Sequence, residues 1–444
     1  MQVGLLDTYR RPVQNRSLFA WVASALLFAF YFLLYLPDYG YFPDYLSQGL
    51  AAAGLHWMSK WNLYGSLYSL AMVIGGWFML KKHGNSRYQR YRTLSLVAVQ
   101  VLFALALPWV LKLLGHPELY LSYLWPLSYD KLFPDTLAQL PGYAAVYFVV
   151  SSLIVAPLVG WYKGKRFYCS WICGCGGLAE TFGDSWRHLS DKSPKAWKIE
   201  QISIYSILAL VLLTTGLQVA DATSRAGLLQ RSAGTEQAER LELATLLMDE
   251  GQRLKSVSDS DLSARYKDFR DTLSMYQLPE EVAAALPDPR GKDAATLGRE
   301  VELLSYKVIP RGPLTGAAEK IKGTYAFFIG ALFSGAAGVG LYPLMGSRVW
   351  CRFGCPMAAI LGLIQRFGRF RITVKKDMCI ACGNCSTYCE MGIDVRAYAM
   401  ANQDIRRAAC VGCGMCAHVC PRGVLRLETK SDGGPVREEW VLEL

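Results

Sequence analysis

Histidine and charge are both scarce in this chain of 444 residues. Charged side chains make up 19 % of it, and its five histidines all lie outside the long apolar runs. A b-type haem held inside a bilayer needs two histidines there, so no such haem is expected. The sequence also lacks a P-loop and a glycine-rich dinucleotide fingerprint between a strand and a helix, which excludes nucleotide sites of either kind.

Apolar residues are what the chain has in abundance, at 52 %, together with 12 tryptophans and 25 tyrosines. A helix needs roughly 20 apolar residues to cross a hydrocarbon core. Six runs reach that length and predict an all-α polytopic membrane protein. The first run ends without a small-residue cleavage site, so we expect a retained anchor rather than a signal peptide. The runs are Leu18–Leu36, Leu63–Leu80, Leu94–Leu114, Tyr143–Trp161, Ile199–Val219 and Tyr325–Met345.

The basic residues indicate how these helices are oriented. They concentrate before the first run, in residues 81–92 and in residues 163–198, whereas the loops 37–61 and 115–140 have few. Lys and Arg are retained on the cytoplasmic side of membrane proteins. We therefore predict a bacterial cytoplasmic (inner) membrane protein with both termini and all 13 cysteines in the cytoplasm. The net charge of +11 is a topology signal on this interpretation, and no nucleic-acid partner is expected.

Two closely spaced cysteine motifs near the C-terminus carry the clearest chemistry. Both read C-x2-C-x2-C-x3-C, which is the spacing of a bacterial two-cluster ferredoxin, where the fourth cysteine of each run serves the other cluster. Zinc usually takes two separated C-x2-C pairs, so it fits less well. We predict one [4Fe–4S] cluster on Cys379, Cys382, Cys385 and Cys420, and a second on Cys410, Cys413, Cys416 and Cys389.

A second cysteine pattern occurs twice, each time directly after an apolar run. "RFYCSWIC" at 166–173 and "RVWCRFGC" at 348–355 superimpose after a shift of 182 positions. In a reducing compartment, thiols that converge in this way favour a metal over a disulfide. A third iron–sulfur cluster and copper(I) are both open, as are free thiols that pack the helix ends. The candidate ligands are Cys169, Cys173, Cys351 and Cys355, with Cys175 as a candidate extra ligand.

These motifs together resemble the membrane polyferredoxin family over about 140–220 and 324–430. The family includes NapH-type quinol dehydrogenases of periplasmic nitrate reduction, NosR-type proteins and accessory iron–sulfur proteins of cytochrome oxidase assembly. Its C-x3-C-P motif is matched at Cys351, Cys355 and Pro356, whereas the first copy lacks the proline. The resemblance implies electron transfer between the quinone pool and cytoplasmic-side clusters, in the manner of a quinol dehydrogenase. Relatives of the NosR type carry a flavin domain, for which the 17 residues before the first run leave no room, so flavin is not supported.

The repeat and a cysteine-free segment together predict the domain organisation. We expect two pseudo-repeated halves, in which residues 1–219 carry five transmembrane helices and residues 324–372 carry the sixth. Residues 220–323 have apolar positions at helical spacing and form a helical extracytoplasmic insertion, either a docking module or an inert cap. Residues 373–444 form an α+β ferredoxin-like domain.

Partners and alternative functions follow from the same features. Membrane lipid, the quinone pool and a protein redox partner are the expected partners. Aromatic residues near the repeated motifs serve as interfacial anchors or line a quinone headgroup; they are Trp161, Tyr168, Trp171 and Trp350. Two other functions stay open: a copper-reducing or copper-handling assembly factor for a terminal oxidase, and an electron-transfer subunit of a larger respiratory complex.

Overall fold

The fold is given by a computed structural model that describes residues 18–55, 58, 60–113, 119–231, 236–255, 261–276, 278, 280–289, 294–308 and 313–429. The N-terminal basic residues and both chain termini, on which part of the predicted orientation rests, lie outside these ranges. So do residues 430–444 of the predicted ferredoxin-like domain. The chain divides into two compact units, Met1–Thr215 with Lys322–Leu444, and Gly216–Ile321.

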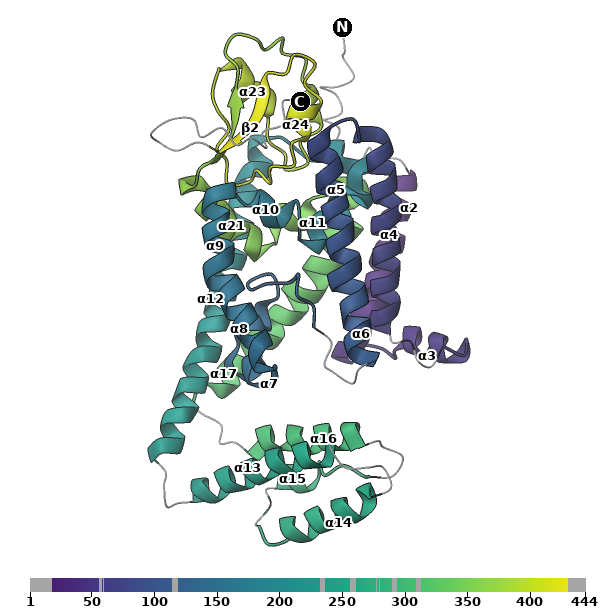
Figure 1. Cartoon of the computed structure of the whole chain (residues 1–444), viewed down its shortest axis with the longest axis vertical. Coiled ribbons are helices and arrows are strands. Elements are labelled where there is room, and N and C mark those ends of the chain that lie inside the picture. The colour runs from purple at the N-terminus through teal and green to yellow at the C-terminus, as the bar shows by residue number, and fades with distance from the viewer. Residues whose placement is uncertain are drawn as a thin grey trace. The chain divides into compact units, whose positions relative to one another are not determined.

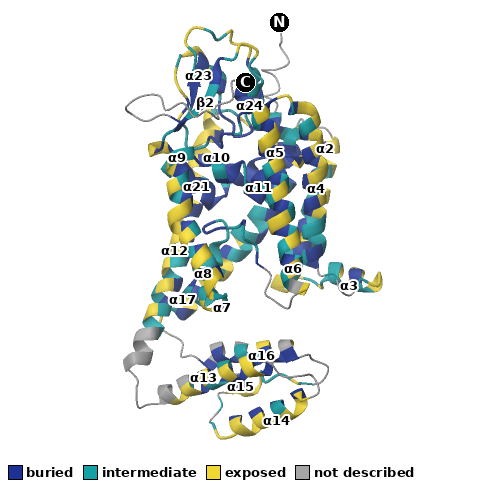
Figure 2. Ribbon diagram, in the orientation of Figure 1, coloured by how far each residue is buried: buried dark blue, intermediate teal, exposed yellow. Residues whose placement is uncertain are grey.

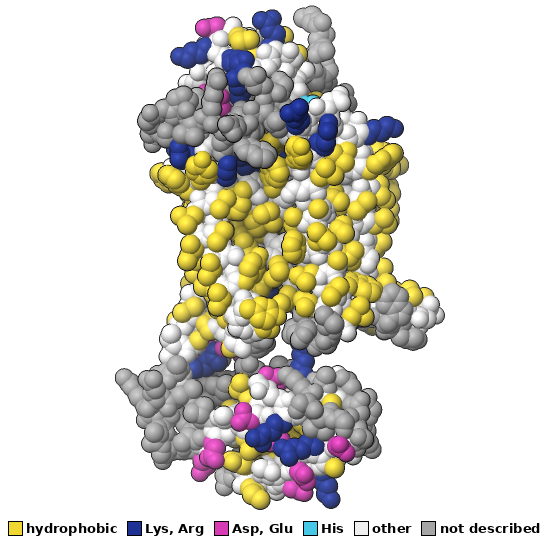
Figure 3. All heavy atoms as spheres, in the orientation of Figure 1, with side chains coloured by type: hydrophobic (Ala, Val, Ile, Leu, Met, Phe, Trp, Pro, Cys, Tyr) yellow, Lys and Arg dark blue, Asp and Glu magenta, His cyan; other side chains and the backbone are white. Residues whose placement is uncertain are grey.

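Six helices in the described ranges are long and apolar enough to cross a membrane, which confirms the six predicted spans and indicates a membrane protein. Their outward faces carry large exposed apolar side chains such as Leu70, Trp77 and Ile202, which form a broad hydrophobic band (Figure 3). An exposed apolar surface of this extent marks a region that contacts a membrane or another protein. The spans are Leu18–Tyr39, Lys60–His83, Arg87–Leu111, Gly142–Lys163, Pro194–Arg225 and Thr315–Gly340.

The spans are built from α-helical pieces (Figure 1). Three of the spans also contain a π-helical stretch. The π-helical stretches are Val101–Ala106, Ser151–Val155 and Ala326–Ala337. The α-helices of the spans are α2 (Leu18–Tyr35), α4 (Lys60–His83), α5 (Arg87–Gln100), α6 (Leu107–Leu113), α8 (Gly142–Val150), α9 (Ala156–Lys163), α12 (Pro194–Arg231), α17 (Thr315–Tyr325) and α18 (Gly338–Gly340). Shorter helices outside the spans are α3 (Tyr45–Ala52), α7 (Pro134–Gln139), α10 (Arg166–Cys169), α11 (Gly174–Glu180), α19 (Tyr342–Met345), α20 (Val349–Phe353) and α21 (Pro356–Phe367).

The segment 119–128 folds inward instead of crossing the surface as a simple outside loop. Leu124 and Trp125 are buried, and the Tyr168 hydroxyl donates to the Ser122 carbonyl at 2.7 Å. The Trp125 indole donates to the Thr215 hydroxyl at 3.1 Å. Irregular backbone survives at membrane depth only where protein groups satisfy its polar atoms. The spans therefore enclose this segment.

The C-terminal part of the first unit is an α+β domain with a ferredoxin-like arrangement. Strands β1 (Phe370–Val374) and β2 (Leu425–Thr429) pair antiparallel, with Ile372 opposite Leu427. Three short helices complete the domain: α22 (Asn384–Thr387), α23 (Val395–Met400) and α24 (Met415–His418). The domain is held to the start of α5, where the Tyr88 hydroxyl donates to the Gly412 carbonyl at 2.7 Å and the Gln89 amide donates to the Cys413 carbonyl at 3.0 Å.

The second unit, Gly216–Ile321, is close to the predicted insertion, which covered 220–323. It has its own apolar core, with Leu247, Phe269 and Leu297 almost fully buried (Figure 2). Its helices beyond the span ends are α13 (Glu236–Lys255), α14 (Leu262–Leu273), α15 (Glu280–Ala283) and α16 (Ala294–Val308).

Close packing of α4 gives a first testable prediction. A methyl group on Gly75 would lie 2.6 Å from the backbone nitrogen of Phe182, whereas one on Gly216 would meet nothing within 4 Å. Backbone cannot move as cheaply as a side chain, so Gly75→Ala should lower the free energy of unfolding by about 1–3 kcal/mol. Gly216→Ala, the matched control, should be neutral or stabilise the helix by up to about 1 kcal/mol. Thermal unfolding in detergent measures both, and equal stabilities would contradict the packing.

Candidate metal centres

The two repeated cysteine motifs share a local backbone path. A glycine with positive φ precedes each motif: Gly164, at 74°, follows α9, and Gly346, at 97°, follows α19. Glycine adopts this conformation without steric cost. A short helical turn follows, and the second cysteine of each motif, Cys173 or Cys355, is extended and caps the next helix. The 182-residue shift that superimposes the motifs also superimposes these glycines. The same turn thus brings each cysteine pair back toward the bundle.

The four thiols of these motifs lie in one buried core with the α+β domain. Within the described residues, Glu180, Glu390 and Cys413 bring three ligand atoms within 4.8 Å of one another, and no three of the repeated-motif thiols do so. Four thiolates on a single zinc ion, at Zn–S bonds of about 2.3 Å, would be about 3.8 Å apart. No three of these thiols are thus as close together as ligands of a single zinc ion would be.

The first motif departs from the C-x3-C-P pattern because its glycines accommodate close neighbours. A methyl group on Gly174 would lie 2.5 Å from the Tyr123 hydroxyl, and one on Gly176 would lie 2.0 Å from the Cys169 carbonyl oxygen. Neither position has room for a proline ring. Cys175, between them, forms a side-chain hydrogen bond with Cys173.

Burial governs the acidity of these thiols. It raises the pKa of Cys169 to about 12 and that of Cys355 well above its usual value. Cys173 differs, because its hydrogen bond with Cys175 outweighs the effect of burial and lowers the pKa of Cys173 to about 7. Among the motif arginines Arg166, Arg348 and Arg352, one has a described contact with a repeated-motif thiol.

That one is Arg348, whose Nη1 lies 3.6 Å from the Cys351 sulfur. Arg166 instead lies over the Phe370 ring, and Arg352 donates to a Glu200 carboxylate oxygen at 2.6 Å. The pattern "R-x2-C" is thus the same twice in sequence but has different partners in the two copies.

The two C-terminal motifs also form matching loops. Ala381 and Gly383 in the first loop, and Gly412 and Gly414 in the second, all have positive φ. Alternating left-handed residues turn backbone N–H groups toward a common centre. Accordingly the N–H of Ala381 donates to the sulfur of Cys379, at 3.4 Å.

Each set of four cysteines predicted to share a cluster lines one cavity. Cys382 is exposed, whereas Cys410 and Cys416 are buried, so the first cavity is the nearer to the surface. The first cavity is lined by Cys379, Cys382, Cys385 and Cys420. The second is lined by Cys389, Cys410, Cys413 and Cys416.

A buried ion-pair network, which the sequence did not reveal, connects the repeated motifs to the second cavity. Glu180 pairs with Arg348 at 2.5 Å and with Arg187 at 3.2 Å, and also with Arg92. Glu390 pairs with Arg187 at 3.2 Å and with Arg348 at 3.1 Å. All five side chains are at most 1 % exposed.

This network reaches a thiol at each end. Arg348 lies beside Cys351, and Arg187 Nη1 lies 3.9 Å from the Cys413 sulfur. Glu180, Glu390 and Cys413 are spaced closely enough to hold a metal ion, but the surrounding guanidinium groups already neutralise both carboxylates. The group is therefore an ion-pair network.

The two carboxyl groups of the network differ in acidity. Burial opposes ionisation of Glu180, but Arg92, Arg348 and Arg187 outweigh it and hold its pKa well below the usual range. Burial raises the pKa of Glu390, because its two arginines only partly offset desolvation and the nearby Glu180 carboxylate. Glu390 follows Cys389 directly, but it is buried and paired, not solvent-exposed.

The four aromatic residues singled out near the motifs have different surroundings. Trp161 is exposed beside Arg369, and Trp171 packs against Tyr88. Tyr168 is buried and holds the segment 119–128. Trp350 lines a large cavity between the spans.

Comparison with known proteins supports the metal chemistry. Residues 371–421 match the family described as "4Fe-4S dicluster domain", and residues 145–196 and 327–375 both match the family described as "4Fe-4S binding domain". The two matches to the second family are again 182 residues apart. The chain is thus an iron–sulfur protein, and both repeated motifs lie within the residues that match the second family.

One curated relative matches a short part of the chain. The chain is 35 % identical over 48 residues to the Escherichia coli (strain K12) protein named "Putative electron transport protein YccM", which is 11 % of this chain and 13 % of that protein. No solved structure matches. These likenesses support an iron–sulfur protein of electron transport.

Removal of one charge tests the ion-pair network. Glu180→Gln keeps the shape of the side chain but leaves three buried guanidinium groups with one carboxyl group, which should cost about 3–5 kcal/mol of unfolding free energy. Glu319→Gln, at an exposed acid in the second unit, should change it by less than about 0.5 kcal/mol. Chemical denaturation of both variants provides the measurement. A Glu180→Gln variant as stable as its parent would show that the network contributes little.

Proposed function

We propose that this chain is a membrane-bound electron-transfer protein, similar to a quinol dehydrogenase, that passes electrons between the quinone pool and a protein redox partner. The observation that carries the proposal is the buried path from the repeated-motif thiols to the ferredoxin-like cavities. Cys351, Arg348, Glu390, Arg187 and Cys413 follow one another in contact along it. A protein that only stored iron would not need its metal sites arranged in series from the spans to an exposed end.

The cysteines present fit three clusters. Two [4Fe–4S] clusters would be held by the sets Cys379, Cys382, Cys385 and Cys420, and Cys389, Cys410, Cys413 and Cys416. A third would be held by Cys169, Cys173, Cys351 and Cys355, since these thiols lie together in one buried core. Such clusters would supply one-electron acceptors.

The chain's own residues would set the conditions of transfer. Oxidation of a quinol breaks two O–H bonds and releases two protons to water and two electrons, for which clusters held by these cysteines would supply one-electron acceptors. Arg348 and Arg187 place positive charge beside Cys351 and Cys413, which favours the reduced, more negative state at both sites. The buried carboxyl groups offset part of that charge.

The basic ends of the spans support a cytoplasmic location for the metal sites. Lys81 and Lys82 end α4, Lys163 ends α9, and the α+β domain contacts the start of α5. By the positive-inside rule this end faces the cytoplasm. Exposed Lys376 and Arg422 near Cys382 would attract an acidic redox partner.

Iron and acid-labile sulfide per chain, measured on anaerobically purified protein, test the number of clusters. The parent should contain about 12 irons, and Cys351→Ala should contain about 8, because one [4Fe–4S] cluster is lost. Cys175→Ala, the matched control in the same motif, should keep about 12. A parent with about 8 irons would mean that the repeated motifs hold no cluster.

Reduction by quinol tests the direction of the path. In proteoliposomes under anaerobic conditions, a short-chain quinol should bleach the visible iron–sulfur absorbance of the parent. Cys351→Ala should keep ferredoxin-like clusters that dithionite reduces but quinol does not, because their link to the spans is broken. If quinol fails to reduce the parent while dithionite succeeds, the quinone pool is not the donor.

A further inference from the structure

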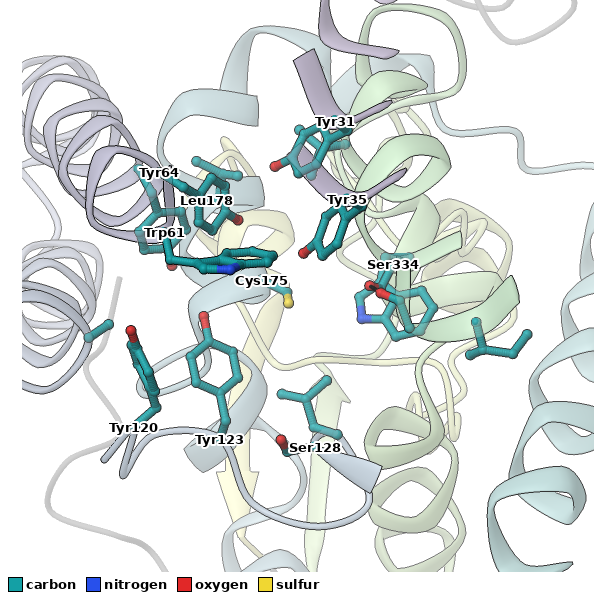
Figure 4. A pocket seen from close by; sticks show the side chains of 18 of the residues that line it. Tyr31, Tyr35, Trp61, Tyr64, Tyr120, Tyr123, Ser128, Cys175, Leu178 and Ser334 are labelled. Carbon is teal, nitrogen blue, oxygen red and sulfur yellow. Dashed lines mark hydrogen bonds between the residues drawn. The ribbon is translucent and has the colours of Figure 1, made fainter. Parts of the chain in front are cut away.

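A cavity of about 630 Å³ lies between the spans of the first unit. It is bounded by α2, α4, the segment 119–129, the start of α11 and the last span. Figure 4 shows Tyr31 and Tyr35 on one side, Trp61 and Tyr64 on the other, and the sulfur of Cys175 between them. The volume is within the range of small-molecule sites, which is about 300–1,000 Å³.

The lining of this cavity selects a neutral, flat ligand. Nine tyrosines and two tryptophans contribute to it, and none of the described lining residues is Asp, Glu, Lys, Arg or His. A charged metabolite would find no counter-ion there, and burial of its charge would be costly. Aromatic side chains stack well on a planar ring. Since the cavity lies between membrane spans, such a ligand would enter from the hydrocarbon phase.

One hydrogen-bond donor that faces this cavity lacks a protein partner. The Tyr123 hydroxyl has no hydrogen-bond partner among the described residues, and Figure 4 shows it turned into the cavity. Polar groups inside native proteins are normally satisfied. A lipid acyl chain would not satisfy this donor, whereas a ring oxygen of a quinone would accept from it. The Trp350 ring also lines the cavity, but its indole N–H is buried away from the cavity space.

The cavity also reaches the first cysteine motif. Cys175 lines it and is hydrogen-bonded to Cys173. A methyl group on Gly174, between the two cysteines, would lie 2.5 Å from the Tyr123 hydroxyl and 2.6 Å from that of Tyr68. The donor end of the cavity therefore lies directly against the thiols that connect to the metal sites.

We propose that this cavity binds the ring of a quinone, with Tyr123 donating a hydrogen bond to a ring oxygen and Cys175 separating the ring from Cys173. The inference rests on the proposed exchange of electrons with the quinone pool and adds the place where the exchange occurs. It also gives Cys175 a role at the cavity wall instead of as a metal ligand.

Photolabelling of the full chain in lipid nanodiscs tests the site without depending on electron transfer. The probe is an azido-substituted benzoquinone with one isoprene unit, and the control probe is an azidobenzene with the same tail and no ring oxygens. Mass spectrometry should locate the quinone label in the segments that contain Trp61–Tyr68, Tyr120–Tyr129 or Tyr325–Tyr342. The control probe should not label these segments selectively.

Three variants make the test specific. Ser334→Phe adds bulk inside the cavity and should abolish the label, whereas Leu70→Phe adds bulk at a lipid-exposed position and should preserve it. Tyr123→Phe removes one donor and keeps the ring, so it should weaken probe binding about 5- to 10-fold, as expected for one hydrogen bond. Iron content, measured on every variant, confirms that the metal sites are intact.

The outcomes separate this inference from the proposed function. A cavity label that Ser334→Phe removes supports the site, even if quinol does not reduce the clusters. A label elsewhere, or one that Ser334→Phe leaves unchanged, would show that the quinone does not bind in this cavity. If quinol still reduces the clusters of the same parent sample, the proposed function stands without this site. Equal labelling by the control probe would mean that the cavity holds lipid, which also overturns the inference.

Discussion

The buried ion-pair network is the interaction on which the arrangement of the metal sites depends. Glu180 follows the first cysteine motif, Arg348 begins the second, and Glu390 belongs to the ferredoxin-like domain. None of these groups could be buried alone, because an unpaired charge in this environment costs several kcal/mol. The network therefore forms only when both motifs and the domain are in place. It couples the correct docking of the domain to the geometry of the thiols.

Glycine residues also help to position the thiols, through the conformation of the backbone. Gly164 and Gly346 turn the chain ahead of the motif in both copies, and this shared turn is what the repeated sequence encodes. The copies differ where their neighbours differ. The second continues into α21 through Pro356, whereas the first has Gly174 and Gly176 because hydroxyl and carbonyl groups approach too closely for a side chain. The missing proline thus reflects a crowded site that has been adapted to its cavity.

The sequence predicted those features that are encoded locally. The length of an apolar run determines whether a helix can span a bilayer, and the spacing of cysteines is visible within a dozen residues. The network and the cavity were not predictable in the same way, since Arg92, Glu180 and Glu390 are separated by 88 to 298 positions in the sequence and each resembles an ordinary charged residue. The inward fold of 119–128 was missed because this apolar segment is too short to span a bilayer and lies in a stretch with few basic residues, which predicted an outside loop. Its hydrogen-bond partners Tyr168 and Thr215 reveal its position.

The three sets of thiols differ systematically in burial, and this order matters for electron transfer. The repeated-motif thiols are buried beside the aromatic cavity, the second ferredoxin-like cavity lies against the ion-pair network, and the first includes the exposed Cys382. Low dielectric strengthens each fixed charge at the buried sites, so Arg348 and Arg187 act most strongly there. At the exposed end solvent screens such charges, and a partner can approach.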